Sequence, residues 1–254
     1  MNRRDFLLST PALGMSVAAC AKAAASVPAV PAAAPAAAPV KPVDSAARIR
    51  DLLKKKDRIV WLITGDSITH GAMHTHGWRS YPEIAQERLR WELGRHGDVV
   101  INTGISGHCA ADITKDFEAR VGMWKPQVVS VNIGMNDAGK MDAPAFAKDL
   151  DALLDRVAAL DAALILHVPN PIRGGGSGRR EKNLAAFGPV IRAAAAARQA
   201  VLADHEAHWK ANAKPGWHND PVHPNGLGHL EMARVMLAAI GLADKSECLR
   251  VKIP

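Results

Sequence analysis

The sequence predicts an α/β domain, a three-layer α/β/α sandwich in which about five parallel strands lie between two layers of helices. Two observations support this prediction. Short apolar runs alternate along the chain with longer segments that show helical periodicity. The apolar runs are continuous, as is typical of strands that helices cover on both faces. Because helices separate the strands, we expect parallel pairing through right-handed crossovers.

Five apolar runs are the predicted strands: residues 59–63, 99–101, 128–133, 163–168 and 200–203. The first four are rich in Val and Ile, which favour strands. The fourth ends at Pro169 and Pro171, because proline lacks the N–H that a strand donates. The fifth is a short candidate.

The predicted helices are residues 82–94, 110–121, 143–160, 181–198 and 226–240. In the clearest of them the apolar side chains fall along one stripe: Phe146, Leu150, Leu153, Leu154 and Val157. Residues 173–180 contain four glycines and cannot form regular structure. A lid and a plain connection remain equal interpretations of that segment.

The first 20 residues have the order of a bacterial export signal. Arg3 and Arg4 precede an apolar stretch, and the arginine pair indicates the route for folded proteins. Residues 17–20 are similar to a lipoprotein cleavage box that ends at Cys20. A lipid anchor at Cys20 and ordinary signal cleavage both remain open. Either way, we expect the protein in the periplasm, the cell envelope or the extracellular space.

Residues 21–45 consist almost entirely of Ala, Pro and Val, and we expect them to form a semi-extended linker. Residues 46–254 are then the folded domain, which is long enough for one α/β domain with a substantial core. The sequence does not indicate an oligomeric state.

The chain is basic, with a formal charge of +7. Its densest positive run, Lys54-Lys55-Lys56, contains no aromatic residue, and we interpret it as a solvated helix end. No nucleic-acid partner is therefore expected.

Cysteines and histidines give no metal-site pattern. Cys109 and Cys248 are expected as buried free thiols, although an exported protein permits a disulfide between them. Five histidines invite a metal interpretation: His70, His74, His76, His218 and His229. No carboxylate set accompanies them, so we expect surface or pocket histidines and no metal.

The chemistry is predicted at the ends of segments. Ser67 follows the first strand, and Asp220 and His223 stand three residues apart near the C-terminus. A serine hydroxyl becomes nucleophilic when an imidazole takes its proton and a carboxylate orients that imidazole. We therefore expect Ser67 as nucleophile, His223 as base and Asp220 as its orienting group.

An ester-cleaving serine also needs hydrogen-bond donors for the developing oxyanion. Residues 102–107 follow the second strand and 134–137 follow the third, at the sheet edge where Ser67 lies. The backbone N–H groups of Gly107 and Ser67 and the side-chain amide of Asn136 are the expected donors.

Taken in order, Gly65-Asp66-Ser67, Gly107, Gly134-x-Asn136-Asp137 and Asp220-x-x-His223 resemble the successive blocks of the SGNH hydrolases, the GDSL-type esterases and lipases. The resemblance runs from the first strand to the last helix. It implies a flavodoxin-like sheet, no cofactor, and hydrolysis of acyl esters, often acetyl groups on carbohydrates. It also implies the residue roles given above.

Two departures and several structural alternatives accompany the resemblance. Ile68 replaces the usual Leu of the first block, and His108 stands where many relatives have an acidic residue. Asp220 and His223 can also be read as caps of the last helix. Asn136 can be read as a turn residue, and Gly107 as a requirement of backbone geometry.

The sequence therefore predicts a serine-dependent esterase or deacetylase acting on short-chain acyl esters of small molecules or polysaccharides. Trp78, Arg79, Tyr81 and His108 are the candidate substrate-binding residues. The alternatives are a non-catalytic carbohydrate-binding or scaffold protein on the same fold, and a metal-dependent hydrolase that uses the histidines.

Overall fold

A computed structural model describes residues 43–71, 73–174, 178–212 and 216–250. The described residues all belong to one compact unit, Ala37–Pro254. The expected export signal, Cys20 and most of the expected linker lie outside the described residues.

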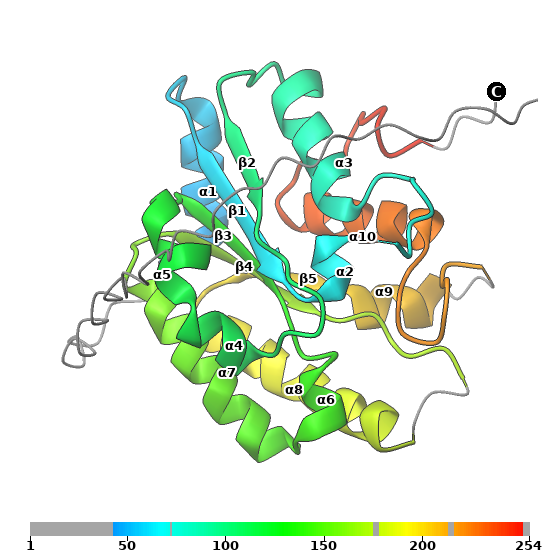
Figure 1. Cartoon of the computed structure of the whole chain (residues 1–254). Helices are drawn as coiled ribbons and strands as arrows, with labels where there is room; N and C mark the ends of the chain where they lie inside the picture. Colours follow the sequence, from blue (N-terminus) through cyan, green and yellow to red (C-terminus); the bar gives the residue numbers. More distant parts are fainter. Residues whose placement is uncertain (1–42, 72, 175–177, 213–215, 251–254) are drawn as a thin grey trace, which may run out of the picture. The chain divides into compact units, whose positions relative to one another are not determined.

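This unit is built on one five-stranded sheet (Figure 1). Its strands are β1 (Val60–Gly65), β2 (Val99–Asn102), β3 (Val128–Asn132), β4 (Ala163–Val168) and β5 (Val201–Asp204). The order across the sheet is β2-β1-β3-β4-β5, and all neighbours are parallel. The predicted α/β class with about five parallel strands is therefore confirmed.

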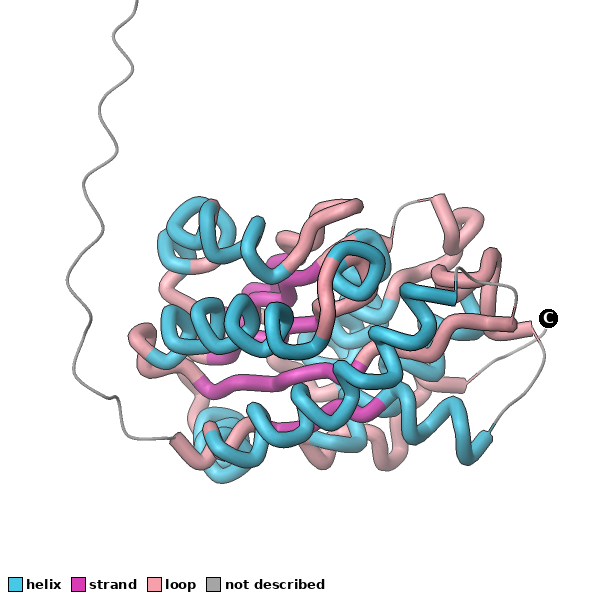
Figure 2. The backbone as a smooth tube through the Cα atoms, turned by 90° about the horizontal axis from the view of Figure 1, so that it is seen from below, coloured by secondary structure: helices cyan, strands magenta, loops and turns pink. Residues whose placement is uncertain are grey.

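The helices and helical turns cover both faces of the sheet (Figure 2). They are α1 (Ser45–Lys54), α2 (Ser67–His70), α3 (Tyr81–Glu87), η1 (Arg88–Glu92), α4 (Ala110–Lys115), α5 (Phe117–Arg120), η2 (Gly122–Trp124), α6 (Asp137–Lys140), α7 (Ala143–Ala158), α8 (Gly178–Ala197), α9 (His205–Asn212) and α10 (Gly226–Ala239). On one face α3 packs on α10, and on the other α7 packs against α4 and α8 (Figure 1).

Burial explains the continuous apolar strands. Every residue of β3 and β4 is buried, so both strand faces need apolar side chains. The predicted stripe of α7 is fully buried against this sheet, and Phe146 stacks on Phe187 of α8 with ring centroids 4.0 Å apart.

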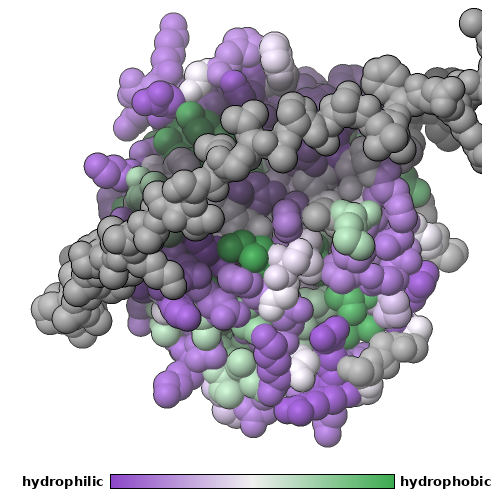
Figure 3. Space-filling view, in the orientation of Figure 1, coloured by the Kyte–Doolittle hydropathy of each residue, from purple (hydrophilic) through white to green (hydrophobic). Residues whose placement is uncertain are grey.

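On the face shown in Figure 3, hydrophobic residues form small separate groups among hydrophilic ones. Among the described residues, no helix is both long and apolar enough to cross a bilayer.

Several element boundaries differ from the prediction. The helix predicted over 82–94 starts as α3 and changes to the π-helical turn η1, and the one over 110–121 breaks at Asp116 into α4 and α5. The expected linker ended at Ser45, but Ser45 is buried in α1 and its hydroxyl accepts a hydrogen bond from the Leu164 N–H. The folded domain therefore begins earlier than predicted. The glycine-rich segment was predicted to be irregular through residue 180, but α8 already begins at Gly178. Residues 175–177 lie outside the described part.

Cys109 and Cys248 are both buried and both free. Burial raises the pKa of each thiol. The disulfide that the sequence left open is therefore not formed in this structure.

Candidate active site

Ser67 is the first residue of α2, directly after the carboxyl end of β1. Asp66 caps this helix: its carboxylate accepts a hydrogen bond from the Ile68 N–H at 2.9 Å. Burial raises the pKa of Asp66 to about 7, although the Ile68 hydrogen bond opposes the shift. Asp66 thus holds the loop, and Ser67 stands half-buried at the sheet edge.

The structure brings Ser67, His223 and Asp220 into one hydrogen-bonded series. Oγ of Ser67 lies 2.9 Å from Nε2 of His223, and Nδ1 of the same ring lies 2.8 Å from Oδ2 of Asp220. A carboxylate only accepts, so Nδ1 of His223 donates its proton to Asp220. Nε2 is then free to accept the Ser67 hydroxyl proton. An imidazole in this tautomer can act as a general base toward serine.

Asp220 is held by its own backbone as well. Oδ1 accepts hydrogen bonds from the N–H groups of Val222 at 2.8 Å and His223 at 2.7 Å. Burial alone would raise the pKa of Asp220, but these bonds and the His223 ring outweigh it and lower the pKa to about 2. The carboxylate is therefore ionised at neutral pH. The cap of α10 is Asn225, so capping does not explain Asp220 and His223.

The loops after β2 and β3 are joined to each other. Gly107 has a left-handed backbone with φ of 83°, which a side chain would strain. The Asn136 amide donates to the carbonyl of His108 at 3.1 Å, and Asp137 accepts a hydrogen bond from the N–H of Ala110 at 2.9 Å. The two expected oxyanion residues, Gly107 and Asn136, thus belong to one hydrogen-bonded pair of loops.

Arg120 supports these loops from within, and sequence reasoning missed it. It is 5% exposed, and one terminal nitrogen donates to the carbonyls of Gly65 at 3.0 Å and Thr103 at 2.8 Å. Its other terminal nitrogen lies 3.0 Å from Nδ1 of His108. A guanidinium only donates, so Nδ1 of His108 accepts, and a neutral His108 carries its proton on Nε2. Arg120 therefore ties the nucleophile loop to the loop that contains Gly107.

His74 lies beside the series Ser67–His223–Asp220, a position that sequence reasoning did not predict. Its ring stacks on that of His223, and its Nδ1 lies 3.4 Å from Oδ2 of Asp220. Burial lowers the pKa of His74, and His223 lowers it further against the opposing effect of Asp220. His74 therefore lies beside His223 as a neutral ring at neutral pH.

His74, Asp220 and His223 also form a possible metal-binding group, because each offers a ligand atom and these atoms lie within 4.8 Å of one another. No other group of this kind occurs among the described residues. An imidazole nitrogen binds a metal ion in the plane of its ring. The two ring planes are nearly parallel, 3° apart, with centroids separated by 3.6 Å, so they do not converge on one ion. A metal here would require a ring to rotate away from its present partner.

The loop after β4 supports the loop that carries Asp220 and His223. Asn170 is fully buried, and its amide donates to the carbonyl of Val222 at 3.2 Å. The N–H of Arg173 donates to the carbonyl of Pro221 at 2.8 Å. The available sequence signal was the position of Asn170 at the carboxyl end of a parallel strand.

Of the four expected substrate-binding residues, Tyr81 is closed off from solvent and His108 is partly exposed. Tyr81 is fully buried, and its hydroxyl lies 3.0 Å from Oγ1 of Thr69. A side chain in this position cannot contact a substrate, so the expectation for Tyr81 is wrong. His108 is half-buried, with one ring nitrogen occupied by Arg120.

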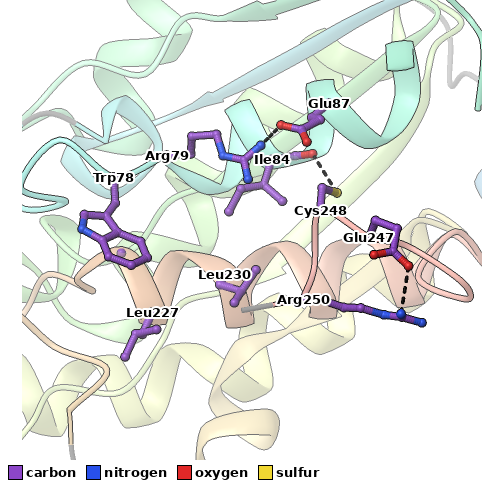
Figure 4. Close-up of a pocket in the computed structure, with 10 residues that line it drawn as sticks. Trp78, Arg79, Ile84, Glu87, Leu227, Leu230, Glu247, Cys248 and Arg250 are labelled. Carbon is purple, nitrogen blue, oxygen red and sulfur yellow. Dashed lines mark hydrogen bonds and ion pairs between the residues drawn. The ribbon is translucent and has the colours of Figure 1, made fainter. Parts of the chain in front are cut away.

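The other two, Trp78 and Arg79, line a cavity of about 390 Å³ between α3 and α10 (Figure 4). Trp78 is 62% exposed. Arg79 forms an ion pair with Glu87 of α3.

Comparisons with known proteins agree with this architecture. The model of the GDSL-like Lipase/Acylhydrolase family matches residues 63–230. An acetylxylan esterase from Geobacillus stearothermophilus is 28% identical over 205 residues, which are 71% of this chain and 93% of that protein. An uncharacterized protein from Mycoplasma pneumoniae is 35% identical over 102 residues, which are 40% of this chain but 12% of that protein. A mutant acetyl-xylooligosaccharide esterase from Geobacillus superposes with a TM-score of 0.62 at 25% identity, covering 72% of this chain and 94% of the other.

Proposed function

The chain belongs to the GDSL-like lipase/acylhydrolase family and is a carboxylic ester hydrolase, and we propose that Ser67 is its nucleophile and that it removes short acyl groups from carbohydrate esters. The observation that carries this proposal is the series Ser67–His223–Asp220, with its two distances of 2.9 and 2.8 Å.

In the proposed mechanism, Nε2 of His223 takes the Ser67 proton while Oγ attacks the ester carbonyl carbon. Asp220, ionised because of its low pKa, stabilises the imidazolium that forms. His223 then protonates the leaving alcohol oxygen, which departs and leaves an acyl-enzyme. Water, deprotonated by His223, attacks the acyl carbonyl, and the carboxylic acid and the Ser67 hydroxyl are restored.

The tetrahedral oxyanion is proposed to accept hydrogen bonds from the N–H groups of Ser67 and Gly107 and from the Asn136 amide. Asn136 uses one amide proton to hold the His108 carbonyl, and its amide has a second. Removing one oxyanion donor typically costs about 3–4 kcal/mol of transition-state stabilisation.

The proposed substrate class rests on the relatives. The Geobacillus protein is an acetylxylan esterase. Structures of that esterase include catalytic mutants in which a serine, a histidine or an aspartate is replaced by alanine. Acetylated carbohydrates are therefore the first substrates to test here. From residues 1–20, we further propose that the protein is exported; a lipid anchor at Cys20 remains part of that proposal.

The test compares the full chain with Ser67→Ala on 4-nitrophenyl acetate, longer acyl esters and acetylated xylo-oligosaccharides, each with and without a chelator. We expect hydrolysis that the chelator does not change and that Ser67→Ala reduces by at least about 10⁴-fold. Unchanged turnover in Ser67→Ala would refute the serine mechanism, and loss of activity in the chelator would favour the metal-dependent alternative. Absence of hydrolysis of every ester would favour a binding protein.

A further inference from the structure

We propose that the cavity between α3 and α10 is a subsite for the sugar units that carry the ester, with the indole of Trp78 as the surface on which a sugar ring stacks. This inference rests on the proposed function and specifies where the alcohol part of the substrate binds.

Two of the segments that line the cavity closely follow residues of the catalytic site in the sequence. Gly226, the first residue of α10, follows His223 by three positions, and it lines the cavity with Trp78. A Cβ on Gly226 would lie 2.7 Å from Cβ of Trp78, so only glycine lets the indole lie this close to α10. Trp78 in turn follows His74, whose ring stacks on His223. Figure 4 shows Trp78 at one end of the cavity and the segment with Cys248 at the other.

The position of His223 decides which part of the ester faces this cavity. In acyl transfer the imidazole protonates the leaving alcohol, so the alcohol lies on the histidine side of the nucleophile. The expected oxyanion donors Gly107 and Asn136 belong instead to the loops after β2 and β3, which hold the acyl carbonyl. Because α10, which starts three residues after His223, forms one wall of the cavity, we assign the cavity to the alcohol side of the ester.

The lining suits an uncharged polyol. Trp78 and Leu227 are 62% and 41% exposed and offer apolar surface to the C–H face of a sugar ring. The charged side chains of the wall are paired, Arg79 with Glu87 and Arg250 with Glu247 (Figure 4).

Within each pair the positive and negative charges cancel. The wall therefore offers hydrogen-bond donors and acceptors to hydroxyl groups without favouring a charged ligand. A cavity of about 390 Å³ lies within the usual range for small-molecule sites, roughly 300–1,000 Å³.

The test uses the full chain and two substrates, acetylated xylo-oligosaccharide and 4-nitrophenyl acetate. We expect Trp78→Ala to lower the ratio of kcat/KM for the oligosaccharide to that for the small ester by about tenfold, mainly through KM. Trp78→Phe, which keeps an aromatic face, should recover part of the loss. The matched control is Trp91→Ala, because Trp91 is 71% exposed on η1 and does not line the cavity.

A binding measurement separates this inference from the proposed function. Calorimetry with deacetylated xylo-oligosaccharide and the Ser67→Ala variant should show binding that Trp78→Ala weakens about tenfold. If wild-type protein hydrolyses acetyl esters but both readouts are unchanged in Trp78→Ala, the subsite is refuted while the esterase assignment stands. A selective loss of activity on long acyl chains would also refute it, because the cavity would then hold the acyl tail.

Discussion

The imidazole of His74 lies flat on that of His223, with ring centroids 3.6 Å apart and ring planes 3° apart. Both rings approach the same oxygen of Asp220, His223 at 2.8 Å and His74 at 3.4 Å. The stack restricts rotation of the His223 ring. It also places the neutral ring of His74 in contact with the His223 imidazolium that forms in the proposed mechanism. His74 is thus a positioning residue for the base.

Replacing His74 should therefore slow the chemical step. In His74→Ala we expect kcat to fall about tenfold with little change in KM, because His223 gains freedom to leave the line between Ser67 and Asp220. His74→Phe keeps a flat ring and should retain most of the activity. Steady-state kinetics checks this, with His96→Ala as an exposed control. Equal losses in His74→Ala and His74→Phe would show that stacking is not the cause.

Arg120 makes a second testable contribution. Arg120→Met would remove the Arg120 donor from the carbonyl of Thr103 and one of two donors from the carbonyl of Gly65, which keeps the Ile105 N–H. Leaving a buried polar group unsatisfied costs roughly 1–3 kcal/mol. The nucleophile loop and the Gly107 loop would also lose their common support. We expect kcat of Arg120→Met to fall on the order of 10- to 100-fold. The kcat of Arg120→Lys should lie between those of Arg120→Met and the wild type.

The control for Arg120 is Arg156→Met. Arg156 also donates to a carbonyl, that of Thr114, at an exposed site. Kinetics is measured at a temperature where circular dichroism shows that all the proteins are folded. A loss of activity under these conditions reflects displaced loops and not unfolding. Full activity in folded Arg120→Met would contradict the proposed support.

Buried histidines should make the protein less stable in acid. Burial lowers the pKa of His167 to about 3 and of His229 to about 4, whereas an unfolded chain has an ordinary value near 6.5. Below about pH 6.5 the unfolded state binds protons that the folded state excludes, so the free energy of unfolding falls as the pH decreases. At pH 5 each histidine contributes a loss of about 2 kcal/mol. Asp66, with its raised pKa, acts in the opposite direction between about pH 4 and 7.

Urea denaturation of the wild type and His167→Gln measures the contribution of His167 to the loss of stability in acid. The stability difference between the two proteins should shift by about 2 kcal/mol in favour of the variant from pH 7.5 to pH 5. A difference independent of pH would mean that His167 is not held neutral by burial.

The free thiols give a prediction about covalent structure. Without reductant, Cys109 and Cys248 should resist maleimide in the native protein because both are buried, and both should react in denaturant. Peptide mass mapping identifies each labelled cysteine. If neither reacts in denaturant until a reductant is added, a disulfide joins them.

Much of the fold was predictable because its signals are local. Continuous apolar runs locate the strands, and the rule that loops meet at the carboxyl edge of a parallel sheet places Ser67, Gly107 and Asn136 on one side. Asn170 follows β4 and obeys the same rule, so it was within reach of the sequence. His74 was not, because its partner His223 lies 149 residues further along the chain.

Arg120 and Tyr81 both lie on buried faces of helices despite their charged or polar groups. Arg120 follows Ile113 and Phe117 at helical spacing, so it lies on the buried stripe, where a cation is unexpected. Tyr81 begins the buried face that continues through Ile84 and Ala85, which explains why it faces the core. In both cases the helical register indicates burial.

The central claim, that the Ser67 hydroxyl attacks the ester, is tested most directly by treating the full chain with a fluorophosphonate and mapping the mass adduct. A single adduct on the peptide containing Ser67, formed in step with loss of acetyl-ester hydrolysis and absent from His223→Ala, is the predicted result. Hydrolysis that continues while Ser67 is fully modified, or complete inhibition with the adduct on another residue, would contradict it.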